Sequence, residues 1–273
     1  MKVTLKHALS VLLLAIFLLL VLFPFESLIS SEVSLGEMLL GPSATHPLGT
    51  DNLGRDVLLR FSSAVKLAVL PVWAGVVGGF LLGLVVVTGL IALSYLSVVR
   101  FVLRALRLCG AVVTSIPLSL TIFFLAVSYG GNEFMFIVFA IMVFVVFRTM
   151  LMVNDLFDED SNLGFWQANQ ALGGSQFWRL WRYGVFLSWR KKILESLIFQ
   201  MQIAVTIEAM LSYLGFGVQE PSPSFGNMLA SHMELYLRGD MWILIVIVFG
   251  YWMTTQVPQA LGGLLLEPSR VQK

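Results

Sequence analysis

The residue types that usually carry out covalent chemistry are few in this chain and stand apart from one another. The three histidines, His7, His46 and His232, lack the spacing of metal ligands, and the single cysteine, Cys109, has no second cysteine for an internal disulfide. No glycine is followed by lysine, so the GxxxxGK[ST] loop that binds nucleotide phosphates does not occur. The sequence therefore predicts no catalytic residue, and no metal or cofactor bound by this chain.

Acidic residues gather in two places. Asp51 and Asp56 follow His46, but these three residues do not have the spacing that a metal site requires. The run DLFDED, residues 155–160, opens a polar segment, and we interpret it as a solvated linker in preference to a metal site. Neither group predicts an enzyme.

The most informative polar segment is FWQANQALGGSQFWRLWRYGVF, residues 165–186, which lies between two long apolar runs. Tandem glycines separate two short helices, and Ser175 is placed to cap the second helix. One face of that helix is apolar, formed by Phe177, Leu180, Trp181, Gly184 and Val185. The opposite face carries Trp178, Arg179, Arg182 and Tyr183. Such a helix either lies on a lipid surface or docks a partner protein, for which Trp, Tyr and Arg are the usual anchors.

The composition places these segments in a membrane protein. Of the 273 residues, 58% are hydrophobic and only 12% are charged, whereas soluble domains carry about 25% charged residues. Uncharged runs repeatedly reach the roughly 20 residues that span a bilayer. The formal net charge of +1 gives no basic field that would favour nucleic acid.

Six segments are predicted to cross the membrane: 8–25, 67–93, 108–129, 134–153, 193–214 and 241–266. The first follows Lys2 and Lys6, which also suit a secretory signal, but no convincing cleavage site follows and we expect this span to remain. Glycines recur every four residues in the second span, at Gly75, Gly79 and Gly83, and predict close approach of another helix. Pro117 predicts a kink in the third span.

Positive charge predicts which loops face the cytoplasm. With both termini inside, 13 of the 17 Lys and Arg residues lie in cytoplasmic segments. Residues 154–192 then form the longest cytoplasmic loop, and residues 26–63 and 215–240 form outer loops. In the first outer loop we expect Thr50 or Asp51 to cap an amphipathic helix that rests on the membrane surface and leads into the second span. Val57, Phe61 and Ala64 would share one face of that helix.

The fifth span is the least apolar and carries the candidate translocation-path residues. Gln200, Glu208 and Ser212 form one polar stripe, and Glu195, Gln202 and Thr206 form a second, narrower stripe. A carboxylate such as Glu208 is expensive if it faces lipid. Gln202, Thr206 and Glu208 therefore either line an interior path, or Glu208 accepts hydrogen bonds from the glycine-rich turn that follows it.

Three motifs resemble one family of membrane proteins. The segment QANQALGGSQFWRLWRYGVF resembles the cytoplasmic EAA loop of ABC-importer membrane subunits. HPLGTDNLGRDVLLR (46–60) and EAMLSYLGFGVQEPSPSFGNML (208–229) resemble the C-type permease subunits of the dipeptide, oligopeptide and nickel importers. The loop departs from the family pattern in having Gln167 for the glutamate, Asn169 for the second alanine and Phe186 near the usual proline. Ala168, Leu172 and Gly173 match it.

The resemblance implies an all-α integral membrane fold, the type I ABC importer permease (MetI-like) fold with six transmembrane helices and a cytoplasmic coupling helix. The five-helix core would cover residues 64–266, after the first helix at 1–25 and before a cytoplasmic tail at 267–273. By resemblance, the residues that couple to the ATPase are Gln167, Ala168, Leu172, Gly173, Ser175, Phe177, Trp178 and Arg179.

The resemblance also implies the partners. They are a second permease subunit, two ABC ATPase subunits that bind ATP and Mg²⁺, an extracytoplasmic substrate-binding protein and the lipids of a bacterial inner membrane. The chain would import peptides or a related small solute. The alternative is a stand-alone secondary transporter, for which inverted repeats are expected; we find no convincing repeat.

Overall fold

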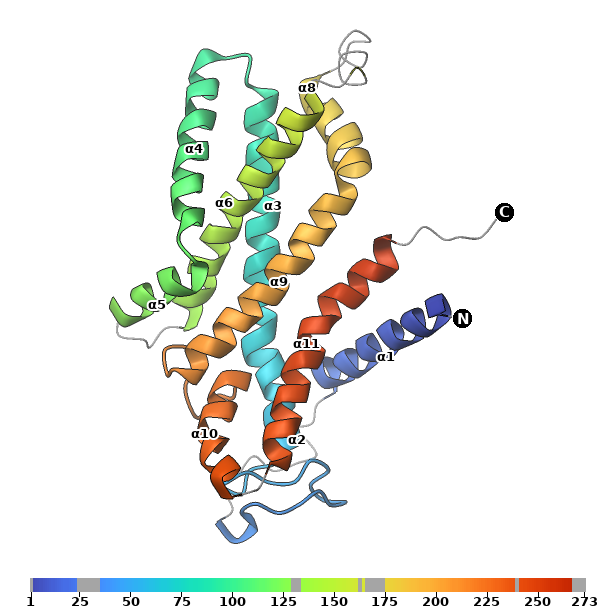
Figure 1. Cartoon of the computed structure of the whole chain (residues 1–273), viewed down its shortest axis with the longest axis vertical. Helices are drawn as coiled ribbons and strands as arrows, with labels where there is room; N and C mark the ends of the chain where they lie inside the picture. The colour runs from blue at the N-terminus through green and yellow to red at the C-terminus, as the bar shows by residue number, and fades with distance from the viewer. Residues whose placement is uncertain are drawn as a thin grey trace. The chain divides into compact units, whose positions relative to one another are not determined.

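The computed structural model describes residues 2–23, 35–128, 134–161, 164, 175–238 and 241–266, and these residues contain helices and loops but no strand. Figure 1 shows the helices in order. They are α1 (Lys2–Leu22), η2 (Leu35–Glu37), α2 (Val57–Ala64), η3 (Val65–Val69), α3 (Leu70–Ala92), α4 (Ser97–Ser115), α5 (Leu118–Ser128), α6 (Phe134–Ser161), α8 (Gln176–Arg179), η4 (Leu180–Ser188), α9 (Arg190–Tyr213), α10 (Phe225–Arg238) and α11 (Trp242–Leu266).

The chain forms two compact units. The first holds Met1–Trp73, Leu125–Ile137 and Met201–Lys273, and the second holds Ala74–Phe124 and Val138–Gln200. Because the boundaries fall inside α3, α5, α6 and α9, each of these helices contributes residues to both units.

Four helical segments are long and apolar enough to cross a membrane: Val57–Ala92, Phe134–Ser161, Arg190–Tyr213 and Trp242–Leu266. A fifth is present if the bent pair of α4 and α5 counts as one span. The apolar part of α1, His7–Leu22, is shorter. The predicted all-helical membrane architecture is therefore confirmed, with four or five qualifying spans among the described residues in place of the six predicted.

The third predicted span differs most from expectation. The helix α4 begins at Ser97, well before residue 108, and α5 leaves it at an angle of 84°. Pro117 is the cause, because a residue that precedes proline is disfavoured in the helical region, and Ile116 is extended at φ −87° and ψ 131°. The carbonyl of Pro117 then accepts the first hydrogen bonds of α5. Pro117 breaks this segment, whereas a kink was predicted.

The glycine stripe of α3 is confirmed as a site of close helix packing within the second unit. A Cβ placed on Gly79 would lie 2.5 Å from the carbonyl oxygen of Met142, and one on Gly83 would lie 2.8 Å from that of Val146. Both carbonyls belong to α6. The absence of side chains at these positions lets the two backbones touch.

In the first unit, α2 differs from the predicted surface helix. Its N-cap is Asp56, whose Oδ1 accepts a hydrogen bond from Leu59 N at 3.0 Å, so the expected capping by Thr50 or Asp51 is wrong. Val57, Phe61 and Ala64 are buried, and α2 continues through the π-helical turn η3 into α3. This segment is packed inside the protein because α11 lies against it.

The first unit also contains packing partners that the sequence pattern did not predict. α1 packs against α11 (Figure 1), and the rings of Phe17 and Trp73 lie 5.2 Å apart. α10 follows the Gly- and Pro-rich loop at residues 214–224 and contacts α11. Gly226 allows α10 to approach the backbone oxygen of Ala209 in α9, where a Cβ would clash.

Candidate functional site

Within the EAA-like segment 165–186 of the predicted coupling loop, the structure describes the residues from Ser175 onward. Gln167 lies outside the described residues, as do Ala168, Leu172 and Gly173, which match the EAA pattern. Ser175 caps α8 as predicted, because its side chain accepts a hydrogen bond from Trp178 N at 3.3 Å. The start of the second loop helix is therefore confirmed.

The second helix of the loop, called the loop helix from here on, consists of α8 followed by η4, which has π-helical geometry. Leu180, Gly184 and Val185 are buried, which confirms most of the predicted apolar face. Phe177 was assigned to the same face, but 47% of it is exposed, as is 59% of Trp178. The widened π turn shifts the side chains after Leu180 relative to those before it. Phe177 and Trp178 thus form an exposed aromatic pair at the start of the loop helix.

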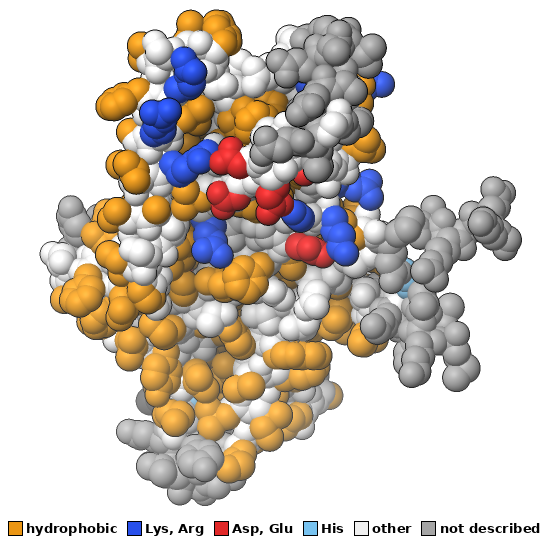
Figure 2. Space-filling view, turned by 45° about the horizontal axis from the view of Figure 1, so that its top comes forward, with side chains coloured by type: hydrophobic (Ala, Val, Ile, Leu, Met, Phe, Trp, Pro, Cys, Tyr) orange, Lys and Arg blue, Asp and Glu red, His pale blue; other side chains and the backbone are white. Residues whose placement is uncertain are grey.

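The acidic run 155–160 is not a linker, because it forms the last turns of α6. Asp158 pairs with Arg107 of α4 at 2.9 Å, and Glu159 pairs with Lys192 of α9 at 2.8 Å. Figure 2 shows acidic and basic side chains gathered on one face of the molecule. The helix outlasts the predicted end at Val153 because these carboxylates have partners on neighbouring helices.

Asp160 makes the most buried of these contacts. Its Oδ2 accepts hydrogen bonds from Trp189 Nε1 at 2.7 Å and from Ser188 Oγ at 2.9 Å. Trp189 is almost fully buried and lies where η4 ends and α9 begins. The sequence reasoning missed this pair, because a carboxylate and an indole 29 positions apart carry no local signal.

Two residues of the narrower polar stripe of α9, Gln202 and Thr206, face α11 within the first unit. Gln202 Nε2 donates to the carbonyl of Thr255 at 2.9 Å, and Thr206 Oγ1 lies 2.8 Å from the hydroxyl of Tyr251. Thr206 is itself exposed. These two candidate path residues are therefore brought together along one helix pair.

The side chain of Glu208 lies on a different face of α9 from Gln202 and Thr206. It is 1% exposed, and Ser212 Oγ donates to its Oε1 at 2.6 Å. The same hydroxyl accepts a hydrogen bond from Val218 N at 2.9 Å in the loop after α9. Ser212, which lies in α9, thus connects Glu208 indirectly to the glycine-rich turn, and Glu208 does not share a face with Gln202 and Thr206.

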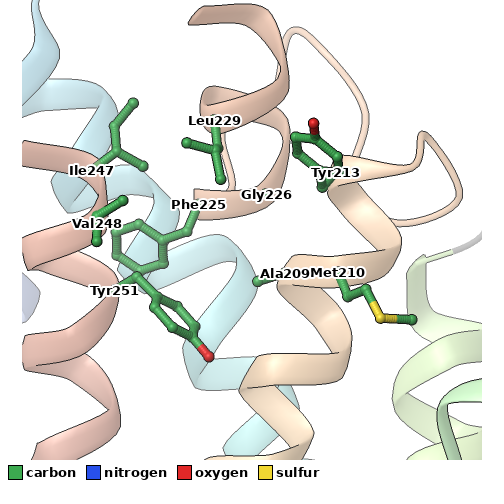
Figure 3. Close-up of a pocket in the computed structure, with 9 residues that line it drawn as sticks. All are labelled: Ala209, Met210, Tyr213, Phe225, Gly226, Leu229, Ile247, Val248 and Tyr251. Carbon is green, nitrogen blue, oxygen red and sulfur yellow. The ribbon is translucent and has the colours of Figure 1, made fainter. Parts of the chain in front are cut away.

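An apolar pocket of about 190 Å³ lies between α9, α10 and α11. Figure 3 shows its lining, which consists of Ala209, Met210, Tyr213, Phe225, Gly226, Leu229, Ile247, Val248 and Tyr251. Tyr251 is also the partner of Thr206, so the pocket adjoins the polar stripe of α9. Its walls suit an apolar side chain.

A cluster of ion pairs joins α2 to the loop after α9. Glu220 accepts hydrogen bonds from Arg60 Nη2 at 2.6 Å and from Arg55 Nη1 at 2.8 Å, and Asp51 pairs with Arg55 at 2.7 Å. Burial favours a higher pKa for Glu220, but the hydrogen bonds from Arg60 and Arg55 outweigh it and hold the pKa of that carboxyl below its ordinary value. His46 lies 2.8 Å from Asp56. The GRDVLLR motif therefore has a structural role in anchoring this loop.

Comparison with known proteins adds the class of transporter. No family model matches the chain. The chain is 28% identical over 251 residues to the dipeptide transport system permease protein DppC of Bacillus subtilis, covering 92% of this chain and 76% of that protein. It is 27% identical over 193 residues to the glutathione transport system permease protein GsiD of Pectobacterium atrosepticum, covering 69% and 60%. The peptide transport system permease protein SapC of Shigella flexneri is 27% identical over 209 residues, covering 74% and 68%.

All three relatives are named as transport system permease proteins, and the matched regions cover most of this chain. The helical structure contains several segments able to cross a membrane, as a permease requires. The chain is therefore similar, over most of its length, to permease proteins of dipeptide, glutathione and peptide transport systems.

Proposed function

We propose that this chain is the C-type permease subunit of an ATP-driven importer for peptides or a related small solute. It forms half of a translocation pathway, and a second permease forms the other half. Its cytoplasmic loop couples the conformational changes of two ATPase subunits to the pathway. The exposed aromatic pair Phe177 and Trp178, at the capped start of the loop helix, carries this proposal. Exposed aromatic side chains beside arginines are typical anchors for a partner protein.

In this proposal the chain crosses the membrane six times with both termini in the cytoplasm. The spans are α1, the continuous segment of α2, η3 and α3, the bent pair of α4 and α5, α6, α9 and α11. The positive charge of the loops supports the orientation. The ion-paired loop around Glu220 then lies outside, where a substrate-binding protein docks.

Transport follows if the ATPase contacts the loop differently in its nucleotide states. A ligand moves an equilibrium only by its differential affinity for two conformations, so docking must change during the ATP cycle. Movement of the loop would change the position of α9, the helix that carries Gln202 and Thr206. The contact between Thr206 and Tyr251 places this stripe beside the apolar pocket, and both would meet an amphipathic solute. Covalent chemistry and ATP binding belong to the ATPase subunits.

Purification of the tagged chain from its own membranes in mild detergent tests the proposal. We expect a second permease and a pair of ATPases to copurify. Truncation of both anchors in the variant Phe177→Ala with Trp178→Ala should weaken the affinity for the ATPases by more than roughly 30-fold, which is the loss expected from a single anchor residue worth about 2 kcal/mol. The second permease should remain bound.

Tyr95→Ala is the matched control, because Tyr95 is an exposed aromatic outside the loop. It should retain the ATPases. An unaltered chain that purifies without any ATPase would contradict the proposal, and would instead favour a transporter that acts alone.

A further inference from the structure

The end of α6 and the start of α9 are joined by a part-buried contact to the buried indole of Trp189. Asp160 accepts hydrogen bonds from Trp189 Nε1 and Ser188 Oγ through the same oxygen, Oδ2. Hydrogen bonds to a carboxylate are roughly twice as strong as neutral ones. The contact closes the base of the loop that carries α8 and η4.

Trp189 is held on its other sides as well. Its backbone N–H donates to the carbonyl of Gly184 at 2.8 Å, and its own carbonyl accepts from Ile193 N at 2.8 Å. The indole covers Gly184 so closely that a Cβ there would lie 2.8 Å from the ring. Trp189 therefore belongs at once to the last turn of η4 and the first turn of α9.

The other charge contacts at the end of α6 are weaker. The pairs Asp158 with Arg107 and Glu159 with Lys192 are largely exposed, and exposed ion pairs contribute little. Ser188 is exposed too. The indole contact with Asp160 is thus the joint that best resists bending between the loop helix and α9.

We propose that Asp160 is a positioning residue for coupling: it locks Trp189 so that displacement of the loop helix is passed on to α9. The inference rests on the proposed function of the loop. When the hydrogen bond between Asp160 and Trp189 is present, η4 and the first turn of α9 move together with the end of α6. Without it, the chain bends at Trp189 and the displacement ends in η4.

Hydrogen exchange of the purified complex tests this without knowledge of the solute. Exchange is compared in ADP and in a non-hydrolysable ATP analogue, for amides of η4 and of the first turn of α9. In the unaltered complex both segments should change with nucleotide. In Asp160→Ala the change in η4 should persist, while the change in α9 should fall by about tenfold, since the lost hydrogen bond holds the joint closed.

Two variants separate positioning from a loss of structure. Asp160→Asn keeps an oxygen acceptor for the indole and should restore much of the response in α9. Trp189→Phe keeps an aromatic side chain at this position but removes the donor, and it should resemble Asp160→Ala, with no further loss when the two are combined. Asp155→Ala, at an exposed carboxylate of the same turns, should respond as the unaltered complex does.

The outcomes are distinguishable. If η4 of the unaltered complex does not respond to nucleotide, the proposed coupling function fails. If η4 responds and Asp160→Ala still passes the full change to α9, the role of Asp160 is overturned while the coupling function stands. A uniform rise of exchange in both nucleotide states, with the difference in α9 preserved, would show a merely structural role and would also overturn it.

Discussion

Glu220 illustrates how single residues hold the loop after α9. Both of its carboxylate oxygens face arginines, and the side chain of Arg60 is only 6% exposed. A nearly buried guanidinium needs a counter-charge, because an unpaired buried charge is costly. The glutamate therefore stabilises the arginine as much as the loop.

We expect this contact to depend on pH. Because the folded-state pKa of Glu220 is lowered, its contribution is fully present above the ordinary glutamate pKa of about 4.3 and is lost as the pH falls through the lowered value. Glu220→Gln should destabilise the purified protein by about 1 kcal/mol at neutral pH, a figure discounted because the side chain is 41% exposed. Thermal unfolding across pH should show the difference vanish in acid.

Glu37→Gln serves as the control, since Glu37 is half-exposed and 3.9 Å from His46. Its unfolding temperature should stay near that of the unaltered protein. Equal stability of Glu220→Gln at neutral pH would contradict the role given to these arginines.

Among the elements, the pairing of α3 with α6 depends on backbone contact. Carbonyls of α6 lie against the stripe of Gly79 and Gly83, whereas neighbouring Gly78 has open space where a Cβ would be. Glycine in a helix otherwise costs up to about 1 kcal/mol relative to alanine. The two adjacent glycines thus provide a direct comparison.

Gly79→Ala should destabilise the protein by about 2 kcal/mol, because overpacking a close contact forces the backbones apart. Gly78→Ala should be neutral or slightly stabilising, since it gains helix propensity without a clash. Thermal unfolding in detergent measures both. A Gly79→Ala protein as stable as Gly78→Ala would show that α3 and α6 do not pack in this way.

At the scale of the whole molecule, the proposed orientation is open to direct measurement. Cys109 is the only cysteine, so a Cys109→Ser background permits single cysteines elsewhere. A cysteine at Ser222, in the exposed loop after α9, should react with an impermeant maleimide in intact cells. A cysteine at Gly164, in the segment after α6, should react only after permeabilisation. The reverse pattern would invert the proposed topology.

The sequence by itself determined features that depend on local physics. Apolar length predicted α3, α6, α9 and α11, the four-residue glycine spacing predicted a close helix contact, and Ser175 predicted a helix start. Each is decided within a few residues, because helix periodicity, capping and the absence of a Cβ act over one or two turns.

Only the tertiary structure decided the contacts between distant segments. The sharp break at Pro117 and the extension of α6 through the acidic run both depend on what packs nearby, since proline permits a kink or a break and a carboxylate run permits a linker or a helix. Asp160 finds Trp189 across 29 positions, and Arg60 finds Glu220 across 160. Partners so far apart carry no periodic signal, because the fold brings them together only after the local elements have formed.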